Sequence, residues 1–584
     1  MAGDCLGLRI HPWPLLRHQG NPLPCRSTDQ PRPAIVSGSS ILTESTSAPE
    51  LAGLRHRRSR QHVGVHAPKA RDYHKTTALL HTAMMVGRRI PRWRVTMAPA
   101  SAHVYAALHN RATLVPLAVT VGVLTGLGAV VFRWLVVFFT RAFTGYTDYS
   151  ALGRVPSAHW PALGWWFLLA APAIAGAVYG PLVHRFAPEA RGHGVPEVMY
   201  AVARNNGRIT PQVTVVKAVA SALCIGGGGS VGREGPIVQI GSATGSALGQ
   251  LLRLDTDRIR LLVACGAAGG ISATFNAPLA GVFFALELIL RDFAAESAGV
   301  VLLSSVAAAV VGRTLMGDHP FLSLPGFTVH HPVEYVAYAA LGVGAGVVGT
   351  LFSRVLYWIE DACDWLWRGP QWARPAVGGI ALGALLIALP QMYGVGYPVL
   401  QNAIDGRYAV AMLLLLMVGK IVATSLTIGI GGSGGVFAPT LFIGAMAGSA
   451  FGVAAHQLYP SLAIAAGACG LIGMGALLGG ATGAPITAVV TIFELTGQYA
   501  IILPLMTAVA MAAGTARLLG RHTIYTAKLW RRGIDLDTAA APPEQTRASA
   551  TRHRSHTPQP ADHLPTPPRG MTDTKRIAAQ RLMS

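Results

Sequence analysis

Residues 226–241 read GGGGSVGREGPIVQIG, in which a run of glycines leads into an arginine, a glutamate and a proline. Proline is favoured at the first position of a helix, because the N–H group that it lacks would have no partner there. The glycines let the preceding backbone bend and approach other groups closely. The stretch therefore predicts a helix that begins near Pro236, after a bend that leaves N–H groups accessible.

The start of such a helix suits an anion. Its unpaired N–H groups carry about half a positive charge, and backbone amides in this position often bind anions. Each unpaired group facing lipid would cost several kcal/mol, so the segment must lie inside protein and line a cavity. The alternative is that the glycines serve helix packing alone. That explains the GxxxGxxxG row from Gly241 to Gly249, but not the four glycines and the charged pair before Pro236.

The same stretch partly resembles two nucleotide-binding patterns. Gly227, Gly229 and Gly232 satisfy GxGxxG, but no βαβ pattern surrounds them, and the match alone is weak. A phosphate-binding loop fails because Arg233 and Glu234 stand where Lys and Ser/Thr are required. A nucleotide enzyme is therefore not expected.

The composition indicates a membrane protein. Of 584 residues, 51% are hydrophobic and 12% are charged, against about 25% charged in soluble domains. Several apolar runs reach the roughly 20 residues that a transmembrane helix needs; they cover residues 115–140, 161–183, 299–316, 337–358 and 409–428. We expect an all-α polytopic membrane protein in contact with lipid, in the cell (inner) membrane if the source is bacterial.

The net charge of +21 lies mostly in the two ends of the chain. Residues 1–110 hold 15 Lys/Arg against 5 Asp/Glu, and residues 521–584 hold 11 against 5. Basic residues beside membrane spans usually mark cytoplasmic ends and contact anionic lipid. Neither end shows a nucleic-acid-binding pattern, and the six cysteines show no metal-ligand spacing. No nucleic-acid partner, metal or cofactor is expected.

Three regions follow from this pattern. Residues 1–111 are predicted to be a basic, disordered tail, and translation is expected to start at Met84, Met85 or Met97. Residues 112–520 are predicted to form the transmembrane domain. Residues 521–584 are predicted to be a basic, mostly disordered tail without a regulatory domain.

The transmembrane domain repeats itself. The stretch from Lys217 matches the stretch from Lys420 at a shift of 203, and Pro236 falls on Pro439. Further on, Glu287 falls on Glu494 at a shift of 207. We therefore expect two helical repeats, about 112–316 and 333–520, whose relative orientation the alignment leaves open. Glycine- and proline-interrupted helices in matching places of two repeats indicate a transport site.

Glu234 is the strongest candidate for a functional side chain. A carboxylate among N–H groups that suit an anion can itself occupy the site, and protonation would release it. Glu234 would then act as a gate that couples anion occupancy to protons. The alternative is a structural ion pair with Arg233, although adjacent residues on a helix do not face each other.

Four motifs in this order resemble those of the CLC family of chloride channels and chloride/proton antiporters. They are GHGVPE at 192–197, GREGP at 232–236, GGVFAP at 434–439 and ELTGQY at 494–499. The resemblance covers about residues 112–534. It implies a homodimer with one pathway per subunit, two inverted repeats, and broken helices that meet at a central chloride site built from backbone amides.

The resemblance also implies roles for single residues. Glu234 matches the gating glutamate. The amides of Val436 and Phe437 and the hydroxyl of Tyr499 match the ligands of the central anion, while the amides around Arg233 and Gly235 would form an outer site. The segment IYTAKLWRRGID at 524–535 resembles a connector to regulatory domains in larger relatives, but no such domain follows, so control by adenine nucleotides is not expected.

Two positions depart from the family pattern. His193 stands where many members have serine. Its imidazole either donates to the anion, or tightens binding when protonated at acid pH, or points away and is hydrogen-bonded elsewhere. Leu288 stands where well-studied antiporters have a second glutamate that passes protons to the inner solution. Leucine carries no proton, but some antiporters work without that glutamate.

The sequence therefore predicts a transporter of chloride or similar small anions, and no enzyme, since no nucleophile–base or metal constellation is present. The main prediction is a voltage-gated chloride channel gated by Glu234. The alternative is a chloride/proton antiporter that uses Glu234 without the internal proton glutamate.

Overall fold

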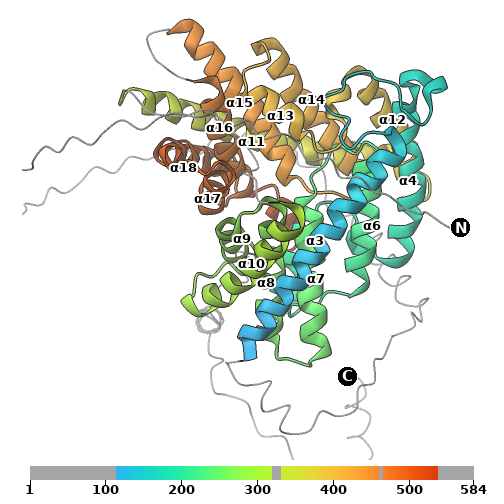
Figure 1. Cartoon of the computed structure of the whole chain (residues 1–584), viewed down its shortest axis with the longest axis vertical. Coiled ribbons are helices and arrows are strands. Elements are labelled where there is room, and N and C mark those ends of the chain that lie inside the picture. The colour runs from blue at the N-terminus through green and yellow to red at the C-terminus, as the bar shows by residue number, and fades with distance from the viewer. Residues whose placement is uncertain (1–112, 318–330, 460–464, 537–584) are drawn as a thin grey trace, which may run out of the picture. The chain divides into compact units, whose positions relative to one another are not determined.

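A computed structural model describes residues 113–317, 331–459 and 465–536, and all the regular elements there are helical (Figure 1). The predicted all-α fold is confirmed for these residues. The first half contains α3 (Leu114–Thr144), α4 (Phe167–Phe186), α5 (Val195–Arg204), α6 (Gln212–Gly226), α7 (Glu234–Leu251), α8 (Thr256–Phe275), α9 (Pro278–Phe284) and α10 (Ala295–Met316). The second half contains α11 (Glu334–Leu366), α12 (Arg374–Ala388), α13 (Tyr397–Ile404), α14 (Val410–Gly429), α15 (Phe437–Leu458), α16 (Ala466–Thr482), α17 (Pro485–Thr496) and α18 (Ile502–Leu519).

Eight helical segments are long and apolar enough to cross a membrane. Five of them contain the apolar runs predicted from the sequence. The hydropathy pattern missed Thr256–Phe275, Phe437–Leu458 and Tyr499–Leu519. The first two are 78% buried within the protein, against 39% for Leu114–Thr144. Helices that face other helices can carry glycine and polar residues in place of apolar ones, which lowers the hydropathy signal.

The two halves have the same order of helices. α3 packs on α10 as α11 packs on α18, and α7 packs on α8 as α15 packs on α16. The predicted repeats are therefore present. The halves meet through α4 with α12 and through α9 with α17. One further match was not seen in the sequence: α5 and α13 are both short, begin near a proline, and follow a glycine with positive φ, which is 86° at Gly194 and 90° at Gly396.

Two glutamates bind the halves together by reciprocal contacts. Glu287 of the first half accepts hydrogen bonds from the backbone N–H groups of Ile486 and Thr487, at 3.2 and 2.8 Å, in the first turn of α17. Glu494 of the second half accepts them from Leu279 and Ala280, at 2.9 and 2.7 Å, in the first turn of α9. A carboxylate at a helix N-terminus stabilises the orphan amides there. Each half therefore caps a helix of the other.

Two buried lysines fix the loops that lead into the short helices. Lys217 donates from Nζ to the carbonyl oxygens of Ala190 and Gly192, both at 2.8 Å. Lys420 donates to those of Gly394 and Val395, both at 3.0 Å. These contacts satisfy the charge of each lysine with backbone dipoles. They hold the loop before α5 and the loop before α13 in the same way.

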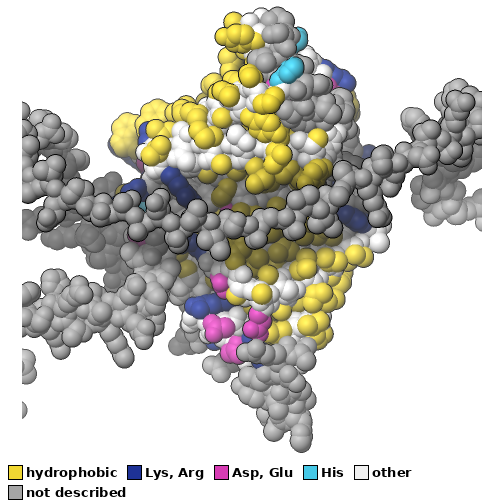
Figure 2. All heavy atoms as spheres, turned by 90° about the vertical axis from the view of Figure 1, so that its left-hand side faces the viewer, with side chains coloured by type: hydrophobic (Ala, Val, Ile, Leu, Met, Phe, Trp, Pro, Cys, Tyr) yellow, Lys and Arg dark blue, Asp and Glu magenta, His cyan; other side chains and the backbone are white. Residues whose placement is uncertain are grey.

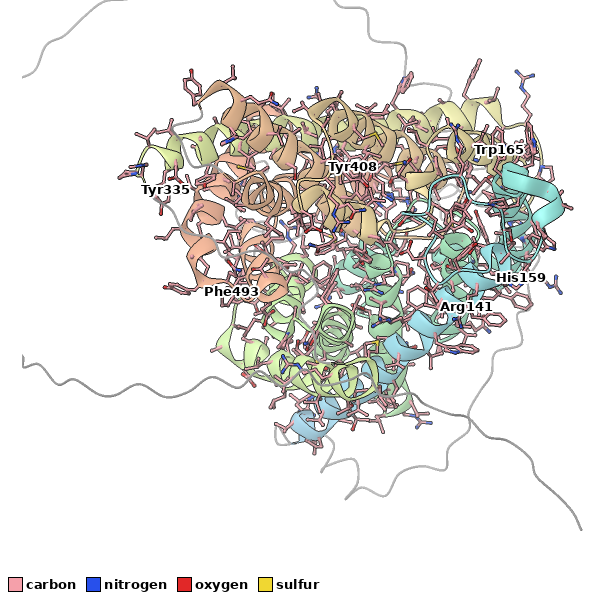
Figure 3. The ribbon with its side chains drawn as sticks, turned by 45° about the horizontal axis from the view of Figure 1, so that its top comes forward. Arg141, His159, Trp165, Tyr335, Tyr408 and Phe493 are labelled. Atoms are coloured by element: carbon pink, nitrogen blue, oxygen red, sulfur yellow. The ribbon has the colours of Figure 1, made fainter. Side chains whose placement is uncertain are left out.

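The surface carries extensive apolar area. Figure 2 shows hydrophobic side chains spread widely over one face, with charged side chains in smaller groups. Exposed large hydrophobic residues lie on α3, α4, α10, α11 and α18, among them Trp134, Val178, Val310, Leu351 and Leu503. Figure 3 places Trp165 and Tyr335 at opposite margins of the helices in that view. Such continuous apolar faces are expected where helices contact lipid.

The chain after α18 is ordered as far as the structure describes it. Residues 521–536 belong to the region predicted to be a mostly disordered tail, and they include α19 (Thr526–Arg531), which packs on α5. Ile524 and Leu529 are fully buried, and Tyr525 is 1% exposed. Three apolar side chains within six residues supply the burial that a disordered tail lacks. The predicted N-terminal tail and residues 537–584 lie outside the described residues.

Candidate anion site

The glycine-rich loops before α7 and α15 are joined to each other by backbone hydrogen bonds. Gly232 donates to the carbonyl of Gly435, and Gly435 donates to that of Gly232, both at 2.7 Å. The loop before α5 joins them, since Gly192 donates to Gly432 at 3.1 Å. Glycine is needed at Gly235, where a Cβ would clash with the carbonyl oxygen of His193 and lie 2.8 Å from Cα of Gly435. The first turns of α7 and α15 therefore meet at one point inside the protein.

Glu234 begins α7 at this meeting point and is fully buried. Its Oε2 lies beside Cα of Gly232, where a Cβ would clash with it, and near the start of α15, since that same Cβ would come 3.1 Å from the backbone nitrogen of Ala438. Oε2 has no hydrogen-bond partner among the described residues. The carboxylate thus lies at the N-terminus of α15, where backbone amides suit an anion. This is the geometry expected of a side chain that competes with an anion for the same amides.

Val436 and Phe437 provide the opposite side of the site. Val436 directly precedes α15 and Phe437 is its first residue, and both are at most 2% exposed. The ring of Phe437 packs against Phe275 and Phe284, with centroid separations of 5.7 and 6.3 Å. These contacts hold the start of α15 while leaving the first-turn amides outside its own hydrogen bonding. Pro439, at which the sequence predicted this helix to start, is the third residue of α15.

Arg233 and Tyr397 cover the carboxylate of Glu234. The Tyr397 hydroxyl donates to Oε1 of Glu234 at 2.5 Å. The guanidinium of Arg233 lies 5.1 Å from the centroid of the Tyr397 ring, and its Nε is 3.8 Å from the same Oε1. The ion pair between Arg233 and Glu234, which the sequence offered as the alternative, is therefore present, and a cation–π contact with Tyr397 accompanies it.

His193 lies in the loop before α5, outside the candidate membrane spans, and is 1% exposed. Neither ring nitrogen has a hydrogen-bond partner among the described residues, which contradicts the alternative that the ring is hydrogen-bonded elsewhere. The ring stacks on Tyr357, with centroids 6.3 Å apart. The charged groups that act on it most are the cations Lys528, Lys217 and Arg532. Burial, and after it repulsion from these cations, lowers the pKa of the imidazole well below its usual value.

The structure does not bring Tyr499 to the site. Its side chain is 81% exposed, in the turn Tyr499–Ile501 that leads into α18. Tyr525, directly before α19, lies there instead. It is 1% exposed, its hydroxyl has no hydrogen-bond partner among the described residues, and it interacts electrostatically with Glu234. The sequence reasoning missed Tyr525 because it sits in the segment that was taken for a connector.

Two cavities flank the site. The Arg233 vestibule, about 300 Å³, includes Arg133, Arg233, Tyr393 and Tyr397 in its lining. The Lys528 vestibule, about 500 Å³, lies on the side of Gly192 and Tyr357, and its charged lining residues are Glu189, Arg191, Glu197, Glu360, Asp364, Lys528, Arg531 and Arg532. Burial lowers the pKa of Lys528, in α19, and the neighbouring Glu360 carboxylate opposes that shift. Both vestibules therefore have charged side chains in their lining.

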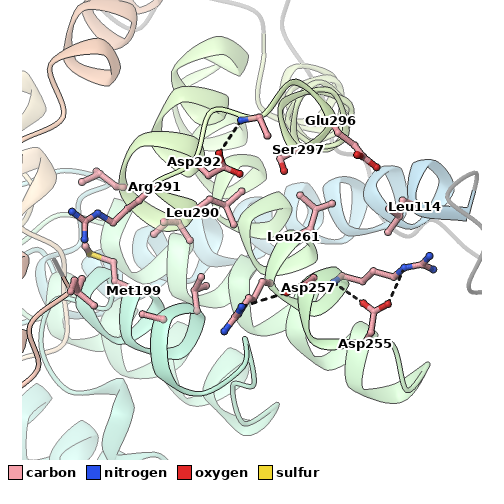
Figure 4. Close-up of a pocket in the computed structure, with 18 residues that line it drawn as sticks. Leu114, Met199, Asp255, Asp257, Leu261, Leu290, Arg291, Asp292, Glu296 and Ser297 are labelled. Carbon is pink, nitrogen blue, oxygen red and sulfur yellow. Dashed lines mark hydrogen bonds and ion pairs between the residues drawn. The ribbon is translucent and has the colours of Figure 1, made fainter. Parts of the chain in front are cut away.

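A larger cavity of about 720 Å³ lies elsewhere, between α8, α10 and the turn after α9 (Figure 4). Its carboxylates are occupied by local partners. Asp255 accepts from the backbone N–H of Arg258 at 3.0 Å, and Asp292 from that of Ala294 at 3.1 Å. The described residues hold no cluster of three or more metal-ligating side chains.

Comparisons with known proteins agree with this geometry. A family model described as "Voltage gated chloride channel" matches residues 175–517. A putative chloride channel protein ClcB-like of Ralstonia nicotianae is 35% identical over 386 residues, which are 65% of this chain and 89% of that protein. The H(+)/Cl(-) exchange transporter ClcA of Vibrio campbellii is 35% identical over 425 residues, 71% of this chain and 88% of that protein.

A solved structure has the same fold. The crystal structure of a slow cyanobacterial Cl-/H+ antiporter superposes with a TM-score of 0.63 and 28% sequence identity. The match covers 73% of this chain and 98% of that protein. The predicted fold of two helical repeats around a broken-helix centre is therefore confirmed by comparison as well as by the geometry.

Proposed function

Since the chain belongs to the CLC family of voltage-gated chloride channels and chloride/proton antiporters, a family of multi-pass anion transporters, we propose that it exchanges chloride for protons. In this proposal Glu234 serves both ions. Its carboxylate competes with the anion for the amides at the start of α15, and its protonated form carries the proton. Anion occupancy and protonation then alternate at one position.

One observation carries the proposal: the buried Glu234 carboxylate lies between the first turns of α7 and α15, with its Oε2 beside Gly232 and without a hydrogen-bond partner among the described residues. A charged carboxylate is favoured there by the same N–H groups that favour an anion. Protonation removes that attraction, so the side chain leaves and the anion enters. In this proposal the location of the Glu234 carboxylate thus explains both the gating of the anion pathway and the binding of the proton.

Exchange is favoured over the channel that was the main sequence prediction. That prediction rested on Leu288, but a relative with 35% identity and a solved structure with 28% identity are described as exchangers. Glu287 does not replace the missing carboxylate, because its oxygens accept from two amides and from the hydroxyl of Thr487. In this chain protons would reach Glu234 from the inner side without a glutamate at 288.

The anion would contact backbone and two side chains. The amides of Val436, Phe437 and Gly235 supply the dipoles, with Arg233 on the outer approach. Tyr525, rather than Tyr499, supplies a hydroxyl, because its buried oxygen needs a partner. His193 would donate one N–H as a neutral imidazole. The homodimer implied by the family, and any voltage dependence, stay predictions.

The test uses the purified protein in liposomes with an imposed chloride gradient and a pH-sensitive dye. Exchange predicts that chloride movement drives protons against their own gradient, and that collapsing the chloride gradient stops this movement. Chloride flux with no driven proton movement would contradict exchange and restore the channel. Liposomes without protein give the leak that both measurements must exceed.

A further inference from the structure

Tyr397 is the described side chain that donates a hydrogen bond to the proposed gate. It is the first residue of α13, and its hydroxyl reaches Oε1 of Glu234 at 2.5 Å. The matching position in the first half is Val195, the first residue of α5. The contact therefore joins the second half to the gate of the first half and has no counterpart across the repeat.

The position of Tyr397 is fixed from two sides. The loop before it is held by Lys420, which donates to Gly394 and Val395. Arg233 lies over the face of its ring at 5.1 Å. Its ring also lines the Arg233 vestibule. A hydroxyl held this firmly loses little entropy when it binds the carboxylate, so its hydrogen bond is effective.

We propose that Tyr397 is a positioning residue that holds the Glu234 carboxylate in the anion position and so sets the pH at which the pathway opens. The proposal rests on the proposed role of Glu234. The hydroxyl donates a hydrogen bond to the charged carboxylate and so stabilises it in the anion position. The charged carboxylate is then harder for an anion to displace and harder to protonate. Without this donor, anions displace the carboxylate more readily and protonation occurs at a higher pH.

Other charged and titratable groups also face Glu234. Arg233 approaches from its own loop, Lys420 from α14 acts on it electrostatically, and Tyr525 approaches from the start of α19. Arg133 of α3 interacts electrostatically with Arg233 and Tyr397, and so acts on Glu234 only indirectly. All of these stay in place when Tyr397 is replaced by phenylalanine. A change in the pH profile of that variant is therefore assigned to the hydroxyl.

The experiment compares Tyr397→Phe with Tyr338→Phe in liposomes, with anion flux measured from pH 4 to 8. Tyr338 is the matched control because its buried hydroxyl also donates to a carboxylate, that of Glu334 at 3.4 Å, and because it lines neither vestibule. A hydrogen bond to a charged group corresponds to roughly a tenfold effect or more. We expect Tyr397→Phe to raise flux at pH 7 about tenfold and to shift the profile up by about one pH unit. Tyr338→Phe should leave the profile in place.

The same substitution in a protein that lacks Glu234 separates a positioning role of Tyr397 from a purely structural one. In Glu234→Ala, the further change Tyr397→Phe should leave flux and its pH profile unchanged, because the group that it positions is gone. An unchanged profile in the single variant, a fall in its flux, or an equal change in the Glu234→Ala background would each overturn the proposal. Failure of chloride-driven proton movement in the unmodified protein would instead remove the exchange proposal and leave this test valid, because anion flux alone reports on the gate.

Discussion

The first turns of α7 and α15 have matching backbones and different side chains. At a shift of 203, Arg233 matches Val436, Glu234 matches Phe437 and Gly235 matches Ala438. The first half places an ionisable gate where the second half places a packed aromatic ring. Both repeats therefore supply backbone amides to the site, but only the first repeat supplies an ionisable side chain that can regulate anion binding. Each prediction below changes one matched position.

The largest effect is expected from Glu234→Gln. Glutamine fits the same space but carries no transferable proton, so proton movement should fall to the level of empty liposomes. Anion flux should persist and lose most of its pH dependence, because no charged carboxylate competes with the anion. The measurement is paired anion and proton flux. A pH profile equal to that of the unmodified protein would show that another group is the gate.

The second effect is on stability, and it is predicted to differ between the halves. Gly235→Ala puts a Cβ against the carbonyl of His193 and Cα of Gly435, which are rigid backbone atoms. Such overpacking costs typically 1–3 kcal/mol, so we expect about 3 kcal/mol here. The matched change Ala438→Gly removes a methyl group from a helix and should cost about 1 kcal/mol. Thermal unfolding of both variants in detergent measures the difference; equal losses would contradict the close contact at Gly235.

The third effect is predicted to be alike in both halves. Glu287→Gln and Glu494→Gln each weaken the cap on a helix of the opposite half. Each should cost about 1 kcal/mol of stability, typical of a lost cap. Neither should change the ratio of chloride to proton movement, since these carboxylates are bound to amides. Loss of proton coupling in Glu287→Gln alone would mean that Glu287 does carry protons.

The smallest effect is expected from His193→Val, which gives the loop before α5 the side chain that Val395 has before α13. The anion would lose one neutral donor, worth about 1 kcal/mol or roughly fivefold in affinity. Because burial and the nearby cations keep the pKa of the ring low, the loss should be the same from pH 5 to 8. Competition between chloride and nitrate measures it. A loss confined to acid pH would show that the imidazole acts as a cation.

Local patterns were enough to predict much of this fold. Proline and glycine marked the starts of α7 and α15 to within two residues, and Glu234 was found because a charge is unusual among apolar residues. The match between α5 and α13 was missed because two short helices share only their glycines and a proline. Tyr525 and Tyr397 were missed because each reaches the gate from another part of the chain. Contacts across such separations leave no periodic signal.

The most direct test of the account locates the anion itself. Crystals of Glu234→Gln grown in bromide, with the anomalous signal of bromide recorded, show whether an anion occupies the position of the carboxylate. The account predicts a peak within hydrogen-bonding distance of the amides of Val436 and Phe437, at the start of α15. A filled bromide site elsewhere, with none at the first turn of α15, would contradict it.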